Sequence, residues 1–466
     1  MARDNRLTTE NPLGYKPIMP LIIKYGIPSV LSMLAMTLYN IVDQIFIGNV
    51  IGVLGNAATT AVFPTVTFTT GISMLLGIGT AANFSIKQGA GQLEEAKKHV
   101  LTGMSSCIYG GLFIFVIMFF FRRPILVLCG ARDNVMPLAY AYLSYTCFGL
   151  PFHVFTHSAA NIIRADGSPR YAMLCTMSGV FLNIFLDWLF MYPFDMGIEG
   201  ASLATVIGQL VSFTVAVLYF RHFKAFDIHL KELGKISFKH LIQNMKTGIP
   251  NFCNHMLMMT TNIVLNNVLV TYGALSIYGE DIPLAISGIA AKVNTIMVAF
   301  AVGTAQGCQP IWGFNKGAKK YDRVKGTYMR AFMIAFAIGA IFFVFLQTMP
   351  RQIISMFGGG NELYYEFAEK YLKIYMMLVF FGNIQPVTIN YFSAVGESLQ
   401  GLLVSLSRQG AFLIPLLVVL PKFWGIEGVL YANPIADTLA FIMSVSMVLF
   451  NFRQMNREKT HIQTDK

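Results

Sequence analysis

The stretch Val180-Phe-Leu-Asn-Ile-Phe-Leu-Asp-Trp188 lies inside an apolar segment that runs from about Tyr171 to Tyr192. As an α-helix, a segment of this length can cross about 30 Å of hydrocarbon. Asn183 and Asp187 are four residues apart, so a helix places the amide and the carboxylate on one face. A carboxylate deep in a membrane span costs roughly 2.5–3.5 kcal/mol on insertion scales, and such residues are mostly functional. The stretch therefore predicts a membrane protein with its chemical centre at Asp187.

The composition of the whole chain agrees with a location in the bilayer. Of the 466 residues, 55% are hydrophobic and 12% are charged, whereas soluble globular proteins carry about 25% charged residues. The six cysteines form no C-x-x-C pair and lie mostly in apolar runs, which favours small buried side chains over disulfides or a metal site. The net charge of +11 comes from basic residues in short loops. It therefore indicates membrane topology and excludes a nucleic-acid partner.

Twelve apolar segments are long enough to span the membrane, which predicts an all-α integral membrane protein with twelve transmembrane helices. Those of the first half are 20–48, 57–86, 99–121, 136–160, 171–192 and 200–220. Those of the second half are 246–272, 283–311, 326–348, 364–394, 401–420 and 427–452. Long continuous apolar runs exclude an outer-membrane barrel. Lys and Arg are concentrated in the loops on the side of the two termini, so we expect both termini in the cytoplasm.

Five short motifs recur in the same order in the two halves. The pairs are Gly26-Ile-Pro28 with Gly248-Ile-Pro250, Gly79-Thr-Ala with Gly303-Thr-Ala, Ala96-Lys-Lys98 with Ala318-Lys-Lys320, Phe148-Gly149 with Phe381-Gly382, and Gly197-Ile-Glu-Gly200 with Gly425-Ile-Glu-Gly428. A nearly constant offset of 222 to 233 residues indicates a duplication. We expect an N-terminal six-helix lobe (1–220), a cytoplasmic linker (221–245) and a C-terminal six-helix lobe with a cytoplasmic tail (246–466). Six spans per copy give both copies one orientation, related by a pseudo-two-fold axis.

Deep ionisable side chains in the first half form a candidate site for a coupling ion. Asp43 of the first span and Thr205 of the sixth can converge with Asn183 and Asp187 of the fifth. A buried carboxyl group can carry a proton, and carboxylates with amide and hydroxyl oxygens coordinate a hard cation such as Na⁺. We therefore expect these four residues to bind H⁺ or Na⁺, without any further cofactor. The residue types leave the choice of ion open.

Other polar residues in the spans are candidates for lining a substrate cavity. They are Asn40, Tyr142, His157 and Asn161 in the first half and His255, Asn262, Lys292 and Asp437 in the second. The alternative for His255 is polar packing between helices, and for Lys292 a side chain that reaches toward the interface. The eleventh predicted span carries Arg408 near its inner end and no carboxylate. The two halves are therefore not chemically equivalent.

The sequence contains no signature of an enzyme. It has no P-loop, no G-x-S-x-G and no H-E-x-x-H motif, so direct coupling to ATP and the common hydrolase mechanisms have no support. A membrane-embedded enzyme would need a nucleophile or a metal constellation, and none is visible. We expect a protein that is not an enzyme.

Six motifs resemble those of one transporter family. They are Gly26-Ile-Pro28, Asp43 with Phe46-Ile-Gly48, Gly89-Ala-Gly-Gln-Leu-Glu-Glu-Ala-Lys97, Ile163-Arg-Ala-Asp-Gly-Ser-Pro169, Leu182-Asn-Ile-Phe-Leu-Asp187 and Gly197-Ile-Glu-Gly-Ala-Ser-Leu-Ala-Thr205. From about Pro17 to Phe452, the chain resembles the multidrug and toxin extrusion (MATE) family and its bacterial MepA-like branch. The resemblance implies a V-shaped monomer of two lobes around a central cavity in the bacterial inner membrane. It would export cationic or amphipathic small molecules in exchange for H⁺ or Na⁺.

The resemblance also bears on the ion site. Family members place a coupling site in the first lobe, at positions that match Asp43, Asn183, Asp187 and Thr205. One branch has a sodium site with acidic residues in the seventh and tenth spans. This chain has His255 in its seventh span and Asn383, Gln385 and Asn390 in its tenth. A sodium site of that kind is therefore not expected here.

One alternative function stays open, namely a flippase for a lipid-linked oligosaccharide or another lipid precursor from the same superfamily. Such proteins often have more spans, and a strongly basic cavity to meet a pyrophosphate group. The deep charges of this chain lean toward acidic residues, which favours cationic cargo.

Overall fold

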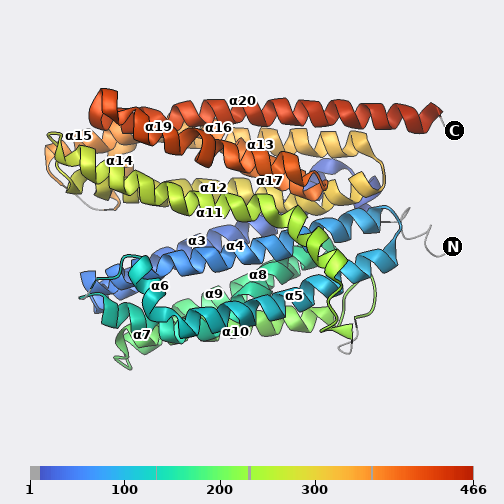
Figure 1. Ribbon diagram of the computed structural model, residues 1–466, viewed down its shortest axis with the longest axis horizontal. Helices are drawn as coiled ribbons and strands as arrows, with labels where there is room; N and C mark the ends of the chain where they lie inside the picture. Colours follow the sequence, from blue (N-terminus) through green and yellow to red (C-terminus); the bar gives the residue numbers. More distant parts are fainter. Residues whose placement is uncertain (1–10, 133, 229–231, 358–359, 465–466) are drawn as a thin grey trace.

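The computed structural model describes residues 11–132, 134–228, 232–357 and 360–464, and the regular structure in these ranges is helical. Figure 1 shows two layers of helices, the first built from α3 to α10 and the second from α11 to α20. We call these layers the first and the second lobe. The start of α3 and the end of α20 lie at the same end of the molecule, which we call the inner end (Figure 1).

The first lobe follows a short helix and consists of long helices with two brief interruptions. The short helix is α2 (Pro12–Tyr15), and the lobe consists of α3 (Ile18–Val50), α4 (Val53–Gly89), α5 (Leu93–Phe120), α6 (Arg122–Leu128), α7 (Met136–Thr146), the 3₁₀ turn η1 (Cys147–Gly149), α8 (Leu150–Ala165), α9 (Pro169–Met191) and α10 (Gly197–Phe220). Pro28 and Pro64 lie inside α3 and α4, where each removes one backbone hydrogen bond.

The second lobe repeats this order with more irregular backbone. Its elements are α11 (Phe238–Ala274), α12 (Asp281–Gly317), α13 (Tyr321–Thr348), α14 (Pro350–Ser355), α15 (Glu362–Lys370), the π-helix η3 (Tyr371–Tyr375), α16 (Val379–Gly382), α17 (Ile384–Ala394), α18 (Ser398–Leu406), the π-helix η4 (Ser407–Leu413), α19 (Ile414–Val419) and α20 (Pro421–Thr464). Non-helical backbone at Gly425, with φ of 57°, kinks α20 near its start.

The predicted all-α membrane fold is confirmed. Within the described ranges, nine helices are long and apolar enough to cross a membrane, or ten if the segments Glu362–Tyr375 and Val379–Ala394, bent by 51°, form one span. The remaining two of the twelve predicted segments coincide with α7–α8 and with α11. The turn η1 divides the first of these into two short helices, and Asn, His and Thr side chains lower the hydropathy of the second.

Glycines bring the two lobes into backbone contact near the inner end. A Cβ added to Gly79 of α4 would lie 1.9 Å from the carbonyl oxygen of Asn244 in α11, and one on Gly248 would lie 1.9 Å from that of Leu75. The equivalent crossing of α12 with α3 places Gly303 against Val30, where an added Cβ would lie 2.6 Å from the Cα atom. Small residues allow helices to approach this closely. Two of the repeated motifs thus form the contact between the lobes.

The first residues of the expected linker are fixed to the first lobe. The backbone N–H groups of Lys224 and Ala225 donate to the Asp166 carboxylate at 2.7 and 3.0 Å, and the Tyr219 hydroxyl donates to it at 2.7 Å. Burial raises the pKa of Asp166 to about 6, although these donors oppose the shift. Phe223 is buried in the core of the first lobe. Helix α11 begins at Phe238, inside the range expected for the linker.

Candidate functional site

Helices α9 and α10 approach each other closely at two glycines, and this approach positions the candidate ion site. A Cβ on Gly179 would lie 2.4 Å from the Gly208 carbonyl oxygen, and one on Gly208 would lie 2.8 Å from that of Gly179. The crossing sets Asn183 of α9 against Thr205 of α10, with the terminal amide of Asn183 3.5 Å from Thr205 Oγ1. The expected convergence of the fifth and sixth spans therefore has a geometric cause.

The Asn183 amide links Asp187 to the backbone of α10. Its side-chain nitrogen donates to Asp187 Oδ2 at 3.0 Å, and its side-chain oxygen accepts from the Thr205 backbone N–H at 3.0 Å. This orientation satisfies both groups of the amide. The Asp187 side chain is fully buried, so its carboxyl group depends on Asn183 and on its other close neighbours.

Asp43 of α3 completes the group of residues that we call the first-lobe cluster: Asp43, Asn183, Asp187 and Thr205. It is 7% exposed, and its Oδ1 atom is buried without a hydrogen-bond partner. The Asp43 and Asp187 carboxyl groups are close enough to interact electrostatically. Tyr142 of α7 lies with its hydroxyl beside that of Thr205.

The chemistry of the first-lobe cluster fits a proton or a hard cation. It offers two carboxyl groups, an amide and a hydroxyl, and one carboxylate oxygen is an unpartnered acceptor. Two buried carboxyl groups at short range share their protons as a coupled pair, and the same oxygens suit Na⁺. Among the described residues, no group of three or more His, Cys, Asp or Glu is arranged to hold a metal ion. The sequence did not single out Tyr39, whose hydroxyl also lies beside Thr205.

The residues expected at the fourth and seventh spans lie where the lobes face each other. The His157 ring of α8 packs against that of His153 at a centroid distance of 4.2 Å, and His153 Nε2 is 3.1 Å from Thr70 Oγ1 of α4. His255 of the second lobe is within electrostatic reach of His157. Asn161 is buried one turn further along α8. These side chains form a polar strip between the lobes.

Three other expected residues are exposed in the outer halves of their helices. Asn40 of α3 donates from its side chain to the Met36 carbonyl oxygen at 2.7 Å. Asn262 of α11 and Lys292 of α12 expose much of their side chains. In the described part of the chain, Lys292 forms no ion pair with a carboxylate. The structure does not bring these residues into the first-lobe cluster.

Asp437 lies in a different cluster, inside the second lobe. Arg408 Nε donates to Asp437 Oδ1 at 2.5 Å, and Arg408 Nη2 donates to Asn433 Oδ1 at 3.3 Å. Asn433 in turn donates to the Tyr375 carbonyl oxygen at 2.9 Å and to Asp437 Oδ2 at 3.3 Å. We call Arg408, Asn433 and Asp437 the second-lobe cluster. The sequence indicated Arg408 and Asp437 separately, but not that they pair.

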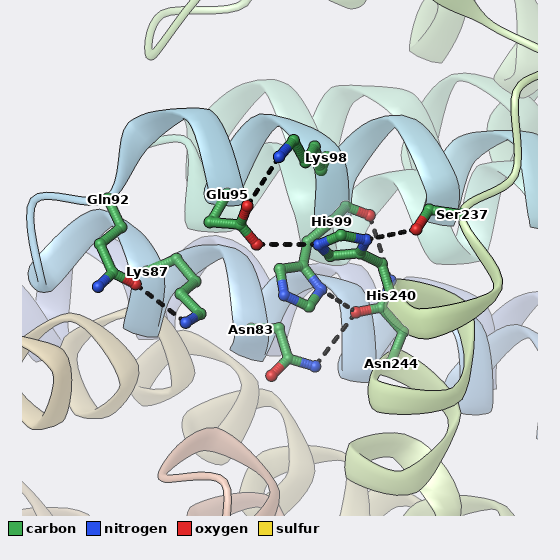
Figure 2. A network of polar contacts seen from close by, with 9 residues as sticks. All are labelled: Asn83, Lys87, Gln92, Glu95, Lys98, His99, Ser237, His240 and Asn244. Atoms are coloured by element: carbon green, nitrogen blue, oxygen red, sulfur yellow. Dashed lines mark hydrogen bonds and ion pairs between the residues drawn. The ribbon is translucent and has the colours of Figure 1, made fainter.

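A polar network, not expected from the sequence, joins the lobes at the inner end (Figure 2). Asn244 of α11 accepts at its side-chain oxygen from Asn83 of α4 at 3.1 Å and from His99 Nδ1 of α5 at 2.7 Å. Its amide nitrogen donates to Thr80 Oγ1 at 3.0 Å. Because an amide oxygen only accepts, His99 carries a hydrogen on Nδ1.

One turn before Asn244, a second set of contacts extends this network. His240 Nε2 is 3.0 Å from Glu95 Oε2, and Lys98 donates to the other oxygen of Glu95 at 2.8 Å. The rings of His99 and His240 meet edge to face with centroids 4.7 Å apart. We call Asn83, Glu95, His99, His240 and Asn244 the inner latch. It connects α4 and α5 of the first lobe to the start of α11.

The equivalent position in the other half of the repeat is held by different chemistry. There Arg323, near the start of α13, donates to the carbonyl oxygens of Leu13 at 3.0 Å and Lys16 at 2.7 Å. Asn315 of α12 also donates to Leu13 at 3.0 Å. The start of each lobe's first long helix is therefore held by the third helix of the other lobe.

Known proteins resemble this chain along most of its length. The MatE family model matches residues 28–189 and 256–419, one segment in each half. The multidrug export protein MepA of Staphylococcus aureus is 26% identical over 440 residues, which cover 93% of this chain and 94% of that protein. MepA of Staphylococcus saprophyticus is 26% identical over 439 residues, 92% of each chain. A crystal structure of a MATE in complex with MaL6 has the same fold, with a TM-score of 0.89 at 21% identity and coverage of 96% of this chain and 99% of the other.

Proposed function

The chain belongs to the MatE family, and from this membership we propose that it exports cationic or amphipathic small molecules in exchange for an inward-moving H⁺ or Na⁺. The MepA proteins that it resembles over nine-tenths of its length are multidrug exporters by name. The protein would act in a bacterial cell membrane with both termini in the cytoplasm. In support, the start of α3 and the end of α20 lie at one and the same end of the molecule (Figure 1).

The observation that carries the coupling mechanism is the unpartnered Asp43 oxygen beside the fully buried Asp187. An acceptor buried without a donor is costly, and a proton or a bound cation removes that cost. Arrival of a single positive charge at this pair changes the interactions among α3, α7, α9 and α10. It can therefore bias the balance between two arrangements of the lobes.

The contacts between the lobes support alternating access. The inner latch and the glycine crossings hold the inner end closed, while polar residues in the outer halves, such as Asn40 and Asn262, are exposed. Export requires the inner end to open so that cargo can enter from the cytoplasm. The inner latch would then break and its polar groups would meet water.

The test is transport by the purified protein in proteoliposomes, with a pH gradient and a Na⁺ gradient imposed separately. We expect one of the two gradients to drive export of a cationic dye. Asp187→Asn should abolish driven export while the dye still binds, because the amide cannot gain and lose the ion. Asp195→Asn is the matched control, since Asp195 is exposed in the loop after α9.

Two outcomes would contradict the proposal. Undiminished driven export by Asp187→Asn would remove the ion site from the first-lobe cluster. Movement of a lipid-linked pyrophosphate without any driven dye export would favour the flippase, the alternative from the same superfamily.

A further inference from the structure

The second-lobe cluster is a buried ionic group that the proposed export mechanism does not use. The Asp437 side chain is 1% exposed and that of Arg408 is 17% exposed. Arg408 and Asn433 occupy both carboxylate oxygens of Asp437, and Arg408 also occupies Asn433 Oδ1. The oxygens that a small cation would bind thus already accept hydrogen bonds, Asp437 Oδ1 and Asn433 Oδ1 from the Arg408 guanidinium and Asp437 Oδ2 from the Asn433 amide.

The position of this cluster corresponds to that of the first-lobe cluster in the duplicated fold. The repeat aligns Asn433 with Thr205 and Asp437 with Gln209. A Cβ on Gly149 would lie 2.0 Å from Gln209 Oε1, and the repeated glycine of the second lobe, Gly382, has the Asp437 carboxylate 3.1 Å from its added Cβ. The two clusters therefore occupy related places in the two lobes.

The backbone around the second-lobe cluster is irregular in three places. Arg408 lies in the π-helix η4, and Tyr375 ends the π-helix η3. After η3, the tenth span bends by 51° before it continues in α16. π-Turns inside helices occur frequently at functional sites, and non-helical backbone at membrane depth is tolerated only where protein or a cavity covers it. The regular α9 has no such turn.

Stability alone does not explain a charge pair at this place. Burying two ions costs several kcal/mol each in desolvation, and well-packed apolar residues of the same size are often as stable. Asp437 would otherwise be a buried carboxylate with Asn433 beside it, which is the kind of site that the first lobe offers to a coupling ion.

We propose that the second lobe contains a monovalent-cation site whose permanent occupant is the Arg408 guanidinium, so that only the first lobe exchanges an ion during transport. This inference rests on the proposed function as an ion-coupled exporter. The tethered cation neutralises Asp437 in every state of the cycle. With a single positive charge exchanged at the first-lobe cluster and none at Asp437, one coupling ion moves for each cargo molecule.

The experiment measures the largest dye gradient that a fixed gradient of the coupling ion sustains, with the membrane potential clamped at zero. With a tenfold ion gradient, one coupled ion sustains a dye gradient of about tenfold and two ions sustain about 100-fold. The wild-type protein should reach about tenfold. Arg408→Gln exposes Asp437 to the ion and should move this limit toward 100-fold.

Two variants control for charge and packing. Arg408→Lys keeps a tethered cation, and Arg408→Gln with Asp437→Asn removes the new carboxylate, so both should return to the wild-type limit. The proposal is wrong if Arg408→Gln sustains the same gradient as the double variant.

Ion binding to the detergent-purified protein decides the matter if Arg408→Gln does not fold. The measured quantity is the amount of ²²Na⁺ bound, or of protons taken up, per chain. The Asp187→Asn variant should have lost all of this ion binding. Residual binding that disappears when Asp437→Asn is added would overturn the proposal. Failure of the wild type to export dye would instead defeat the proposed function, and the binding measurement would still decide this inference.

Discussion

Replacing Asn244 by Leu should shift the protein toward the conformation that is open at the inner end. Asn244 is the centre of the inner latch, buried to 1% exposure. Its side chain makes four hydrogen bonds, with Asn83, His99 Nδ1, Thr80 and the His99 carbonyl oxygen. Leu has nearly the same size, so the change removes these bonds without leaving a large cavity.

The free energy lost from inner closure depends on how many of the groups bound to Asn244 are left without a hydrogen bond. A hydrogen bond contributes about 0.5–1.5 kcal/mol net. Asn83 keeps a second acceptor in Thr247 at 3.2 Å, so we expect a loss of about 2–4 kcal/mol rather than the full sum of four bonds. When the inner end opens, water satisfies the same groups, so almost the whole loss favours opening. The population of the open state should therefore rise roughly 30- to 1,000-fold.

Thiol labelling from the cytoplasmic side can measure this rise. Ser85 of α4 is buried at the seam, the contact between the two lobes, where a Cβ on Gly313 of α12 would lie 2.7 Å from the Ser85 Cβ. Ser85→Cys, in a variant whose six natural cysteines are replaced, reacts with an impermeant maleimide only when the seam opens. If closing is faster than labelling, the rate is proportional to the open population.

The matched control is Asn267→Leu, the same substitution at an exposed position of the same helix. We expect wild-type labelling for the control and a rate at least about 30-fold higher for Asn244→Leu. Equal rates for the two variants, with both folded, would refute the view that the inner latch holds the inner end closed.

Two further predictions test the helix crossing and the anchored linker. Gly248→Ala should lower the melting temperature in detergent, because the new Cβ would lie 1.9 Å from the Leu75 carbonyl oxygen. It should also weaken the closure of the inner end by more than about 1–3 kcal/mol. The control Gly288→Ala, which has open space around the new Cβ, should change both quantities little. Asp166→Ala should release the start of the linker, so that trypsin cleaves there about tenfold faster or more, whereas Asp227→Ala, in an exposed linker position, should leave the cleavage rate unchanged.

The sequence predicted the parts of the candidate site whose signal is local. Asn183 and Asp187 share one helix face, and their spacing alone places them together. The convergence with Asp43 and Thr205 could be expected because few other charged or polar groups lie so deep in the first half. Tyr39 escaped notice because aromatic residues are common in membrane spans.

Pairings between distant segments could not be predicted in the same way. Arg408 and Asp437 lie on different helices, and Arg408 points toward α20 from a π-helix that no residue pattern marks. Glu95, His99, His240 and Asn244 looked like ordinary polar residues near helix ends. Their meeting depends on the glycine crossing of α4 with α11, which only the packed structure reveals.

The duplication explains how one backbone can carry an asymmetric mechanism. The glycine contacts at the lobe interface occur in both copies, so the copies share the geometry that permits rocking. The polar groups placed on this frame differ. The first-lobe cluster holds two carboxyl groups, Asp43 and Asp187, that form no ion pair with the described residues, whereas the second-lobe cluster holds one carboxylate bound to Arg408. Two imidazoles join α5 to α11, whereas Arg323 of α13 holds the backbone carbonyl oxygens that precede α3. In both places the second copy uses a permanently charged guanidinium, which keeps its charge at any physiological pH. The response to ions is thereby confined to one lobe, while both lobes supply the moving parts.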